Sequence, residues 1–515
     1  MNCVGNGPLR LAVVVVVVSA SFNVSPAATI NVTTNDNYTK IEAANPGDEV
    51  VIAPGTYSFR VYLTKQAGVT NPIVIRALDP ANPPVWDFGS TLVENAPGSY
   101  GAGDRGRGGW QFSGAKNYRL SGIVFRNCRT ASFNSSGIRY YNTTTNLYLK
   151  DCVFQQNDNG LTGGTQNSQA TVEFCEFNAN GNTNASLSSP THNLYVYGGD
   201  LTVRYSYVHD PVQGQNFHIR CRNATLEYNW FARANSYDGD LMTDDDFSGP
   251  DPFSQTMTLR GNVIVQKSNP LNNSQIIAIY NDGGLANLTL NVRAYYNTFI
   301  GNGGNAAFVH ISNADGTQMT ADISNNILFG TTRPALIENT NAASVSGVNN
   351  WIRTNAVVGT PTSGNLTGSI RSASPGFRNA TAQDYTLTNG SGCINAASPN
   401  VFGLPGREYF SNEATNRQWR IRAAARDLGA FESTTTNAPV GPYDPEPRPR
   451  LSIAPTSGNA IVSWQLFAQD FRLEQSPASP SFIWSNTPGA YDTNAMGLAI
   501  SLSVNSENQW FRLRK

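Results

Sequence analysis

Histidine is scarce in this chain, and its distribution marks one segment as a place where proton transfer could occur. The 515 residues contain four histidines, and three of them, His192, His209 and His218, fall between positions 192 and 218. An unperturbed imidazole titrates near neutral pH, so it can accept or return a proton under ordinary conditions. This segment is therefore the first candidate for a reactive site.

Tyrosines and arginines occupy alternate positions of the same segment. Tyr195 and Tyr197 follow the first histidine, and Arg220 and Arg222 follow His218. A repeat of 23 residues, described below, places Tyr195 beside His218 and Tyr197 beside Arg220. Alternate residues of a strand point to the same side of a sheet. If these side chains point outward, they form one polar patch.

The densest acidic run of the chain, residues 238–246, lies on the next repeat. Asp240, Asp244 and Asp245 could hold Ca²⁺, which prefers carboxylate and carbonyl oxygens. The run lacks the fixed spacing of a calcium-binding loop, so a solvated excursion from the repeat is the alternative interpretation. Ca²⁺ is the only cofactor that the sequence suggests.

Short alternating segments recur along the chain and predict the scaffold that carries these residues. The segments that begin at Leu147 and Ala170 are 23 residues apart, as are those that begin at Leu201 and Ala224. A unit of this size cannot bury its own apolar side, so successive units must stack at the strand spacing of about 4.8 Å. The repeat predicts an all-β fold, a right-handed parallel β-helix that forms a single-stranded solenoid.

Equivalent residues of stacked repeats should form ladders. Asn229, Asn262, Asn297 and Asn326 each follow a strand of the repeat, and we expect their amides to bond one another and hold a turn. Cysteine is not expected to hold the fold, because removal of the signal peptide with Cys3 leaves five cysteines, and an odd, thinly spread set is no disulfide framework. Cys152, one repeat before Cys175, is expected to be a small apolar filler.

The composition and the N-terminus indicate an exported chain. Charged residues make up 14% of the sequence and the net charge is −1, which argues against a nucleic-acid partner. Leu11 to Ala20 form an apolar core, and the small residues Ser25, Ala27 and Ala28 offer a cleavage site, as in a secretory signal. The apolar core is shorter than the roughly 20 residues needed to span a bilayer. We expect a soluble monomer, secreted or held at the cell surface, without a membrane span.

A change of composition separates a C-terminal part. A segment rich in Thr and Pro precedes short alternating strands near Trp464, Trp484 and Trp510, which we expect to pack in a small core. This part resembles the small β-sandwich modules of proteins secreted by polysaccharide-degrading bacteria. The expected boundaries are a signal peptide at 1–28, the β-helix at 29–433, a linker at 434–450 and a β-sandwich module at 451–515.

Several segments resemble known β-helix proteins. Residues 47–57 and 72–77 resemble the opening coils of the pectin-lyase-like superfamily. Residues 374–377, 384–387 and 426–432 resemble the closing segment of many secreted bacterial β-helix proteins. Together with the repeats, this resemblance covers about residues 29 to 433 and implies the fold rather than an activity.

A further resemblance concerns function. His192-Asn-Leu-Tyr-Val196, Ser206-Tyr-Val-His209 and the following basic strand resemble a lyase-like group of bacterial β-helix proteins, which carries a lysine where this chain has His218. The resemblance implies a polysaccharide lyase that cleaves an anionic, uronic-acid-containing polysaccharide by β-elimination. Such an enzyme must neutralise the carboxylate, remove the proton beside it and protonate the leaving oxygen.

The residues of this segment can fill those roles. His218 or His192 would be the base, Tyr195 the acid, and Arg220 with Arg222 would grip the carboxylate. The catalytic candidates are His218, His192, Tyr195 and Arg220, and the substrate-binding candidates are Arg222, Tyr197, His209 and Arg204. Two alternatives stay open: a non-catalytic surface or matrix protein that binds glycans, and a glycoside hydrolase that uses paired carboxylates of the acidic run.

Overall fold

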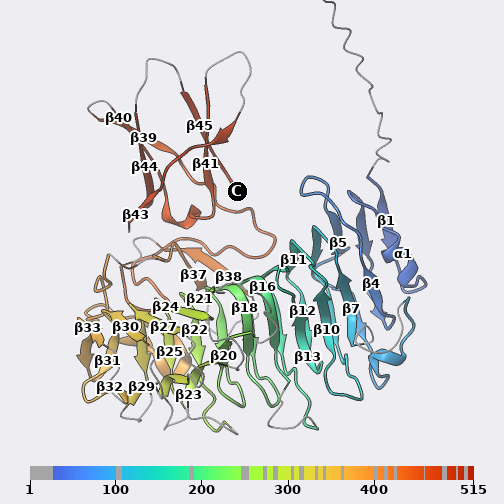
Figure 1. The fold of residues 1–515 in the computed structure, drawn as a ribbon, viewed down its shortest axis with the longest axis horizontal. Helices are drawn as coiled ribbons and strands as arrows, with labels where there is room; N and C mark the ends of the chain where they lie inside the picture. The colour runs from blue at the N-terminus through green and yellow to red at the C-terminus, as the bar shows by residue number, and fades with distance from the viewer. Residues whose placement is uncertain are drawn as a thin grey trace, which may run out of the picture.

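Alternating apolar and polar residues form short parallel strands, and these strands stack into a right-handed parallel β-helix (Figure 1). The predicted fold class is confirmed. The computed structural model describes residues 27–99, 107–184, 191–244, 254–270, 275–281, 288–302, 307–312, 318–330, 335–339, 344–360, 365–399, 401, 403–410, 416–422, 426–456, 459–477, 484–494, 497–503 and 509–515. Most of the predicted signal peptide (1–28) and Asp245 lie outside these residues.

The strands of successive coils form three parallel faces. The first face consists of β4 (Val61–Leu63), β7 (Gly108–Ser113), β10 (Ser136–Tyr141), β13 (Asn159–Gly163), the first parts of β16 (Leu194–Arg204) and β18 (Phe217–Glu227), β20 (Gly239–Met242), β23 (Gln275–Tyr280), β26 (Ala307–Ser312), β29 (Ala335–Asn339) and β32 (Val357–Thr360). The second face consists of β1 (Thr29–Val32), β2 (Glu49–Ile52), β5 (Ile73–Ala77), β8 (Tyr118–Ser121), β11 (Leu147–Lys150), β14 (Gln169–Glu173), the second parts of β16 and β18, β21 (Ser254–Arg260), β24 (Thr289–Tyr295), β27 (Gln318–Ser324), β30 (Ser344–Val348) and β33 (Asn365–Thr367). The third face consists of β3 (Thr56–Tyr57), β6 (Val85–Asp87), β9 (Val124–Arg126), β12 (Val153–Gln155), β15 (Glu176–Asn178), β17 (Tyr207–His209), β19 (Trp230–Ala232), β22 (Val263–Val265), β25 (Thr298–Ile300), β28 (Ile327–Phe329), β31 (Trp351–Arg353) and β34 (Ile370–Ser372). The short helix α1 (Tyr38–Glu42) packs its buried Ile41 against the first coils.

β16 and β18 make the first and second faces continuous. Each is an 11-residue strand that passes straight through the corner, so β16 pairs with β13 at its start and with β14 at its end. Leu147 pairs with Ala170 and Leu201 with Ala224, which confirms the predicted 23-residue repeat.

An asparagine ladder holds the turn between the second and third faces. The amide Nδ2 of Asn229 donates to Asn262 Oδ1 at 3.1 Å, Asn262 donates to Asn297 at 3.0 Å, and Asn297 donates to Asn326 at 3.0 Å. The predicted ladder is confirmed, and it continues to Asn350. All of these amides are buried, so they also satisfy backbone groups that the turn would leave unpaired.

A second ladder, which the repeat pattern did not bring out, lies between the third and first faces. It links Asn157, Asn180, Asn193 and Asn216 through amide hydrogen bonds of 2.8–3.0 Å. Its last member is a carboxyl group, Asp238 Oδ1, which accepts from Asn216 Nδ2 at 3.1 Å. Burial raises the pKa of Asp238 to about 8, so this carboxyl group is largely protonated at neutral pH.

The interior of the solenoid is apolar and closely stacked. Phe125, Phe154 and Phe177 lie on successive coils with ring centroids 5.3 and 4.6 Å apart. Cys152 and Cys175 are buried and unbridged, as predicted. Stacking rather than disulfide bonding therefore holds the described part of the β-helix together.

After the last coil of the β-helix, the chain forms two antiparallel hairpins instead of further coils. They consist of β35 (Phe377–Asn379) with β36 (Asp384–Leu387) and β37 (Arg407–Phe410) with β38 (Gln418–Ile421). Their Tyr385 and Tyr409 pack on Trp230 of the third face. We call residues 373–433 the closing segment, because it covers an outer side of the β-helix.

Two small antiparallel sheets follow the closing segment and stand over β37 and β38 in Figure 1. One consists of β39 (Ser452–Thr456), β40 (Asn459–Trp464), β44 (Gly497–Ser503) and β43 (Asp492–Asn494), and the other of β42 (Ser485–Asn486), β41 (Arg472–Pro477) and β45 (Gln509–Arg514). The segment predicted as a linker is extended, and its Val440 bridges to Trp419 of β38. Within the described ranges, no helix has the length and hydropathy needed to cross a membrane.

The tryptophans of the C-terminal sheets only partly follow the prediction of a core position. Trp464 is buried, and Trp484 is half-buried with the Arg512 guanidinium 4.3 Å from its ring centroid. Trp510 is 53% exposed, so the predicted core position is wrong for this residue. It lies on β45, an edge strand of its three-stranded sheet, and its side chain is on the side of that strand that faces solvent.

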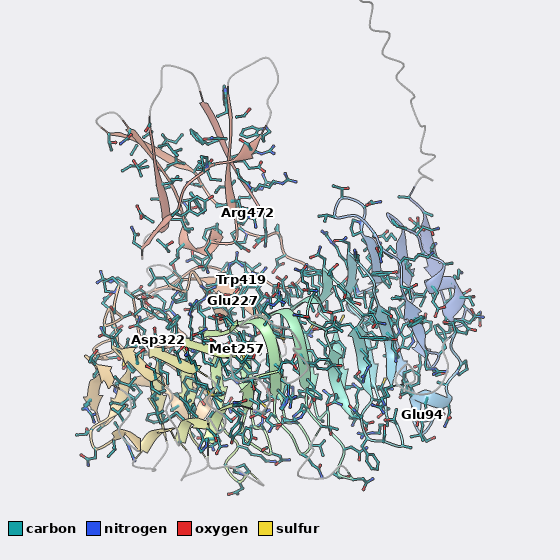
Figure 2. The ribbon with its side chains drawn as sticks, in the orientation of Figure 1. Glu94, Glu227, Met257, Asp322, Trp419 and Arg472 are labelled. Carbon is teal, nitrogen blue, oxygen red and sulfur yellow. The ribbon has the colours of Figure 1, made fainter. Side chains whose placement is uncertain are left out.

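A cluster of charged residues joins the C-terminal sheets to the β-helix. We call it the junction cluster; its members are Glu173, Arg204, Glu227, Arg260, Arg407, Glu446, Asp470 and Lys515. Arg407 is almost fully buried and binds both Glu446 and Asp470 at 3.1 Å, with its guanidinium 4.5 Å from the Trp419 ring centroid. Figure 2 shows Glu227 and Trp419 on the side of the β-helix that faces the C-terminal sheets.

Candidate active site

Alternation along β16 and β18 turns one set of polar side chains outward on the first face. The apolar residues of β16 are buried, whereas Tyr195 and Tyr197 are partly exposed. β18 repeats this alternation and turns His218, Arg220 and Arg222 outward. The register pairs Tyr195 with His218 and Tyr197 with Arg220, so the predicted neighbours are confirmed.

His218 lies between a carboxylate and a guanidinium group. Arg220 Nε donates to His218 Nε2 at 3.2 Å, so Nε2 carries the lone pair. The opposite nitrogen, Nδ1, then carries the hydrogen and donates to Asp240 Oδ2 at 3.0 Å. Asp240 comes from the next coil, where the register pairs it with His218. This arrangement fixes both the tautomer and the orientation of the imidazole.

His192 occupies a different position in the same cluster. It is buried, and its ring stacks on His218 with centroids 4.8 Å apart. The backbone N–H of Gln215 donates to His192 Nδ1 at 3.3 Å, so the neutral ring carries its hydrogen on Nε2. Burial, followed by the positive charge of a protonated His218, holds the pKa of His192 well below its usual range. His192 therefore supports His218 and has no lone pair directed at a substrate.

A hollow of about 190 Å³ opens beside these residues. It is lined by Asn134, Arg139, Thr162, Tyr195, Tyr197, Arg220 and Asp244. His218 does not line the hollow itself, but two of its contacts do: the Arg220 guanidinium, and the Tyr195 ring at a centroid distance of 4.9 Å. Two guanidinium groups at one hollow form a site for an anion such as a carboxylate.

Among the three residues of this hollow that the sequence interpretation missed, which also include Asn134 and Thr162, Arg139 is the charged one. It lies on β10, in the same outward ladder as Thr162 and Tyr195. Its Nη1 and the hydroxyl of Thr162 are buried, and neither has a hydrogen-bond partner among the described residues. Groups of this kind are rare unless water or a ligand satisfies them. The 23-residue interval from Arg139 to Thr162 could have identified this neighbour, but the interval from Thr162 to Tyr195 is longer, so the repeat did not connect Arg139 with Tyr195.

The two described acidic residues predicted to hold Ca²⁺ have different partners in the structure. Asp240 faces His218, whereas Asp244 follows β20 and accepts from the Gly198 N–H at 3.0 Å. Asp245 lies outside the described residues. In the ranges that the structure describes, no group of three or more His, Cys, Asp or Glu side chains is arranged to hold a metal ion. Ca²⁺ prefers six to eight oxygen ligands, and because Asp245 lies outside the described residues, the Ca²⁺ site stays a prediction.

Arg204 and His209 lie away from the first face. Arg204 belongs to the junction cluster on the second face, where it contacts Glu173 and Asp470. His209 lies on β17 of the third face, stacked on Tyr207 with centroids 3.8 Å apart. Burial lowers the pKa of His209, but hydrogen bonds with its neighbouring acidic residues outweigh this effect and raise it. The structure does not bring these two residues together with the hollow.

Comparisons with known proteins returned distant structural matches only. No family model matches the chain, and no curated protein matches it. An alginate lyase from Paenibacillus sp. str. FPU-7 is 13% identical with a TM-score of 0.40, over 67% of this chain and 99% of that one. The catalytic unit of a GH87 alpha-1,3-glucanase from Streptomyces thermodiastaticus is 12% identical with a TM-score of 0.39, over 68% and 69%. Pectin methylesterase PemA from Erwinia chrysanthemi is 10% identical with a TM-score of 0.25, over 70% and 95%. Likenesses this distant say nothing about the activity of this chain.

Proposed function

We propose that this protein is an exported polysaccharide lyase that cleaves a uronic-acid-containing polymer by β-elimination. The observation that carries the proposal is the Asp240–His218–Arg220 arrangement beside a hollow that holds a second guanidinium group, Arg139. A base held in one tautomer and two cations for a carboxylate are the groups that such an elimination needs.

The proposed reaction begins when the substrate carboxylate binds Arg139 and draws the Arg220 guanidinium toward it. His218 Nε2 then loses its donor and can take the proton beside the carboxylate, while Asp240 stabilises the imidazolium that forms. The electron pair of the broken C–H bond forms a carbon–carbon double bond, and the bond to the glycosidic oxygen breaks. Tyr195 donates a proton to that oxygen, which leaves as a hydroxyl group.

The surroundings of Asp240 and Asp244 favour a lyase over a hydrolase. A glycoside hydrolase uses one carboxyl group as acid and a second carboxylate as base or nucleophile. Here Asp240 accepts from His218, and Asp244 accepts from the backbone of Gly198. Because each carboxylate already accepts a hydrogen bond from the protein, the two are not arranged as an acid and a base on opposite sides of one glycosidic bond.

A panel of uronate polymers tests the proposal. Polymers of galacturonate, mannuronate, guluronate and glucuronate are incubated with the protein, with and without a chelator, and the ultraviolet absorbance of the unsaturated product is followed. New reducing ends without that absorbance would establish a hydrolase instead, and binding without cleavage would establish a glycan-binding protein. Loss of activity in the presence of the chelator would support the prediction that the protein binds Ca²⁺.

His218→Ala should lower kcat on the active polymer by about 10²- to 10⁴-fold, the usual contribution of one acid–base group. His310→Ala is the matched control, because His310 lies on the same outward ladder, beyond Asp240 and Ala278. The control should keep wild-type activity. Full activity of His218→Ala would show that this imidazole is not the base.

A further inference from the structure

A second hollow, larger than the first, lies between the third face and the closing segment. Its volume is about 410 Å³, which is in the range of small-molecule sites. Trp230 of β19 forms part of its wall, and Tyr385 and Tyr409 of the closing segment form another part. The catalytic proposal for the first face involves none of these residues.

Three buried polar groups of this hollow have no hydrogen-bond partner in the described part of the chain. They are the indole Nε1 of Trp230, the amide Oε1 of Gln383 and the hydroxyl of Ser433. Trp230 is fully buried, so solvent at the molecular surface does not satisfy its N–H group. Buried polar groups are nearly always paired in native proteins, and three unpaired ones at one hollow indicate a molecule that supplies the missing partners.

Gln383 lies at a turn of the backbone in the same place. Its φ angle is 60°, in the left-handed region, at the end of a short 3-10 helix (Ala380–Ala382). A left-handed residue often ends a helix, and this turn places Gln383 at the wall of the hollow.

The chemistry of the lining indicates an uncharged ligand with several hydroxyl groups. The indole N–H is a donor, the amide oxygen is an acceptor and a hydroxyl group is both, which complements the hydroxyl groups of a sugar. The centroids of the Trp230 and Tyr385 rings lie 5.8 Å apart, with an angle of 29° between the ring planes, and the two rings offer apolar surface. Charged residues of the hollow already have partners: Arg420 binds Glu408, and Asp384 accepts from Thr386.

We propose that this hollow is a saccharide-binding site that takes one neutral sugar ring. It is separate from the first-face site and does not depend on the reaction proposed there. A protein with both sites would hold a neutral portion of a glycan on its third face while the first face engages uronate residues.

Titration of the full chain, labelled with ¹⁵N at tryptophan, tests this site. The probes are the neutral trisaccharides mannotriose, cellotriose and galactotriose, with trigalacturonate as the charged comparison. At least one neutral probe should shift the indole N–H resonance of Trp230, which the Trp230→Phe variant identifies by its absence. Absence of a shift with every neutral probe at millimolar concentration would overturn the proposal, as would a shift with trigalacturonate alone.

Variants separate a binding site from a structural void. Gln383→Asn and Ser433→Ala should each weaken binding by about three- to tenfold, the usual effect of one neutral hydrogen bond. Arg220→Ala, at the first face, should leave this binding unchanged. Wild-type affinity in both Gln383→Asn and Ser433→Ala would also contradict the proposal, and the Ser433 variant tests it even if substitution of Trp230 prevents folding.

Discussion

Replacing Asp238 with asparagine should remove one pH-dependent contribution to the stability of the β-helix. Asp238 ends the second asparagine ladder and accepts from Asn216 at 3.1 Å, and burial raises its pKa from 3.8 to about 8. Between these two pH values the folded state keeps a proton that the unfolded state has released. The stability of the wild-type protein therefore falls as the pH rises through this range, and the fall ends above a pH of about 8.

The size of the effect follows from the pKa shift. One pKa unit corresponds to about 1.4 kcal/mol, so the free energy of unfolding should fall by about 3–4 kcal/mol between about pH 5 and about pH 8 because of Asp238 alone. Asparagine has nearly the same shape and can accept the same hydrogen bond from Asn216, but it has no proton to release. The free energy of unfolding of the Asp238→Asn variant, relative to that of the wild type, should therefore increase as the pH rises.

Urea unfolding at several pH values, followed by tryptophan fluorescence, measures this difference. Asp200→Asn is the matched control, because Asp200 is partly exposed and also accepts from an asparagine, Asn223, at 2.8 Å. The control should keep the pH dependence of the wild type. Parallel stability curves for wild type and Asp238→Asn would refute the reasoning, since they would mean that Asp238 binds its proton equally in both states.

Three further predictions concern the ladders, the junction and the first face. Asn262→Ala leaves the buried backbone N–H of Asn229 without its acceptor. Each buried group left unpaired lowers the free energy of unfolding by about 1–3 kcal/mol, so the urea midpoint should fall clearly. An unchanged midpoint would contradict a structural role for the ladder. Arg407→Ala removes the buried guanidinium that binds Glu446 and Asp470, which keep their contacts with Lys515; the loss of hydrogen bonds to charged groups costs about 1.5–3 kcal/mol. Limited proteolysis should then cut first within 434–450, and a wild-type digestion pattern would argue against the junction. Arg139→Gln should lower kcat/KM on the active uronate polymer by about 10²-fold or more, whereas unchanged kinetics would remove Arg139 from the site.

Much of the fold could be predicted because a parallel stack converts a sequence interval directly into a spatial neighbour. Coils related by 23 residues place Leu201 beside Ala224 and Tyr195 beside His218. The asparagine ladder at Asn262 was identified in another way: its members are 33, 35 and 29 residues apart, but each of them lies just after a strand. Local alternation was sufficient for these inferences because the inner side of each strand is apolar.

Prediction from the sequence failed where the interval changed and where a corner was not recognised. Arg139 was missed because the step between Thr162 and Tyr195 is longer than 23 residues. Arg204 was grouped with the first-face residues although Gly198 and Gly199 mark the corner within β16, because the alternation of buried and outward residues continues beyond that corner. Which of two faces an outward residue occupies depends on the bend of the whole coil, and alternation alone does not encode that bend.

The passage of β18 through the corner has a consequence for protein engineering. One continuous strand carries His218 and Arg220 at its start and Glu227 at its end, where Glu227 enters the junction cluster. The C-terminal sheets are therefore not an exchangeable cassette that can be removed at residues 434–450. A chimera with a foreign module would have to replace Asp470, which contacts both Arg204 of β16 and Arg407 of the closing segment, whereas Glu227 would keep Arg204 and Arg260 within the β-helix.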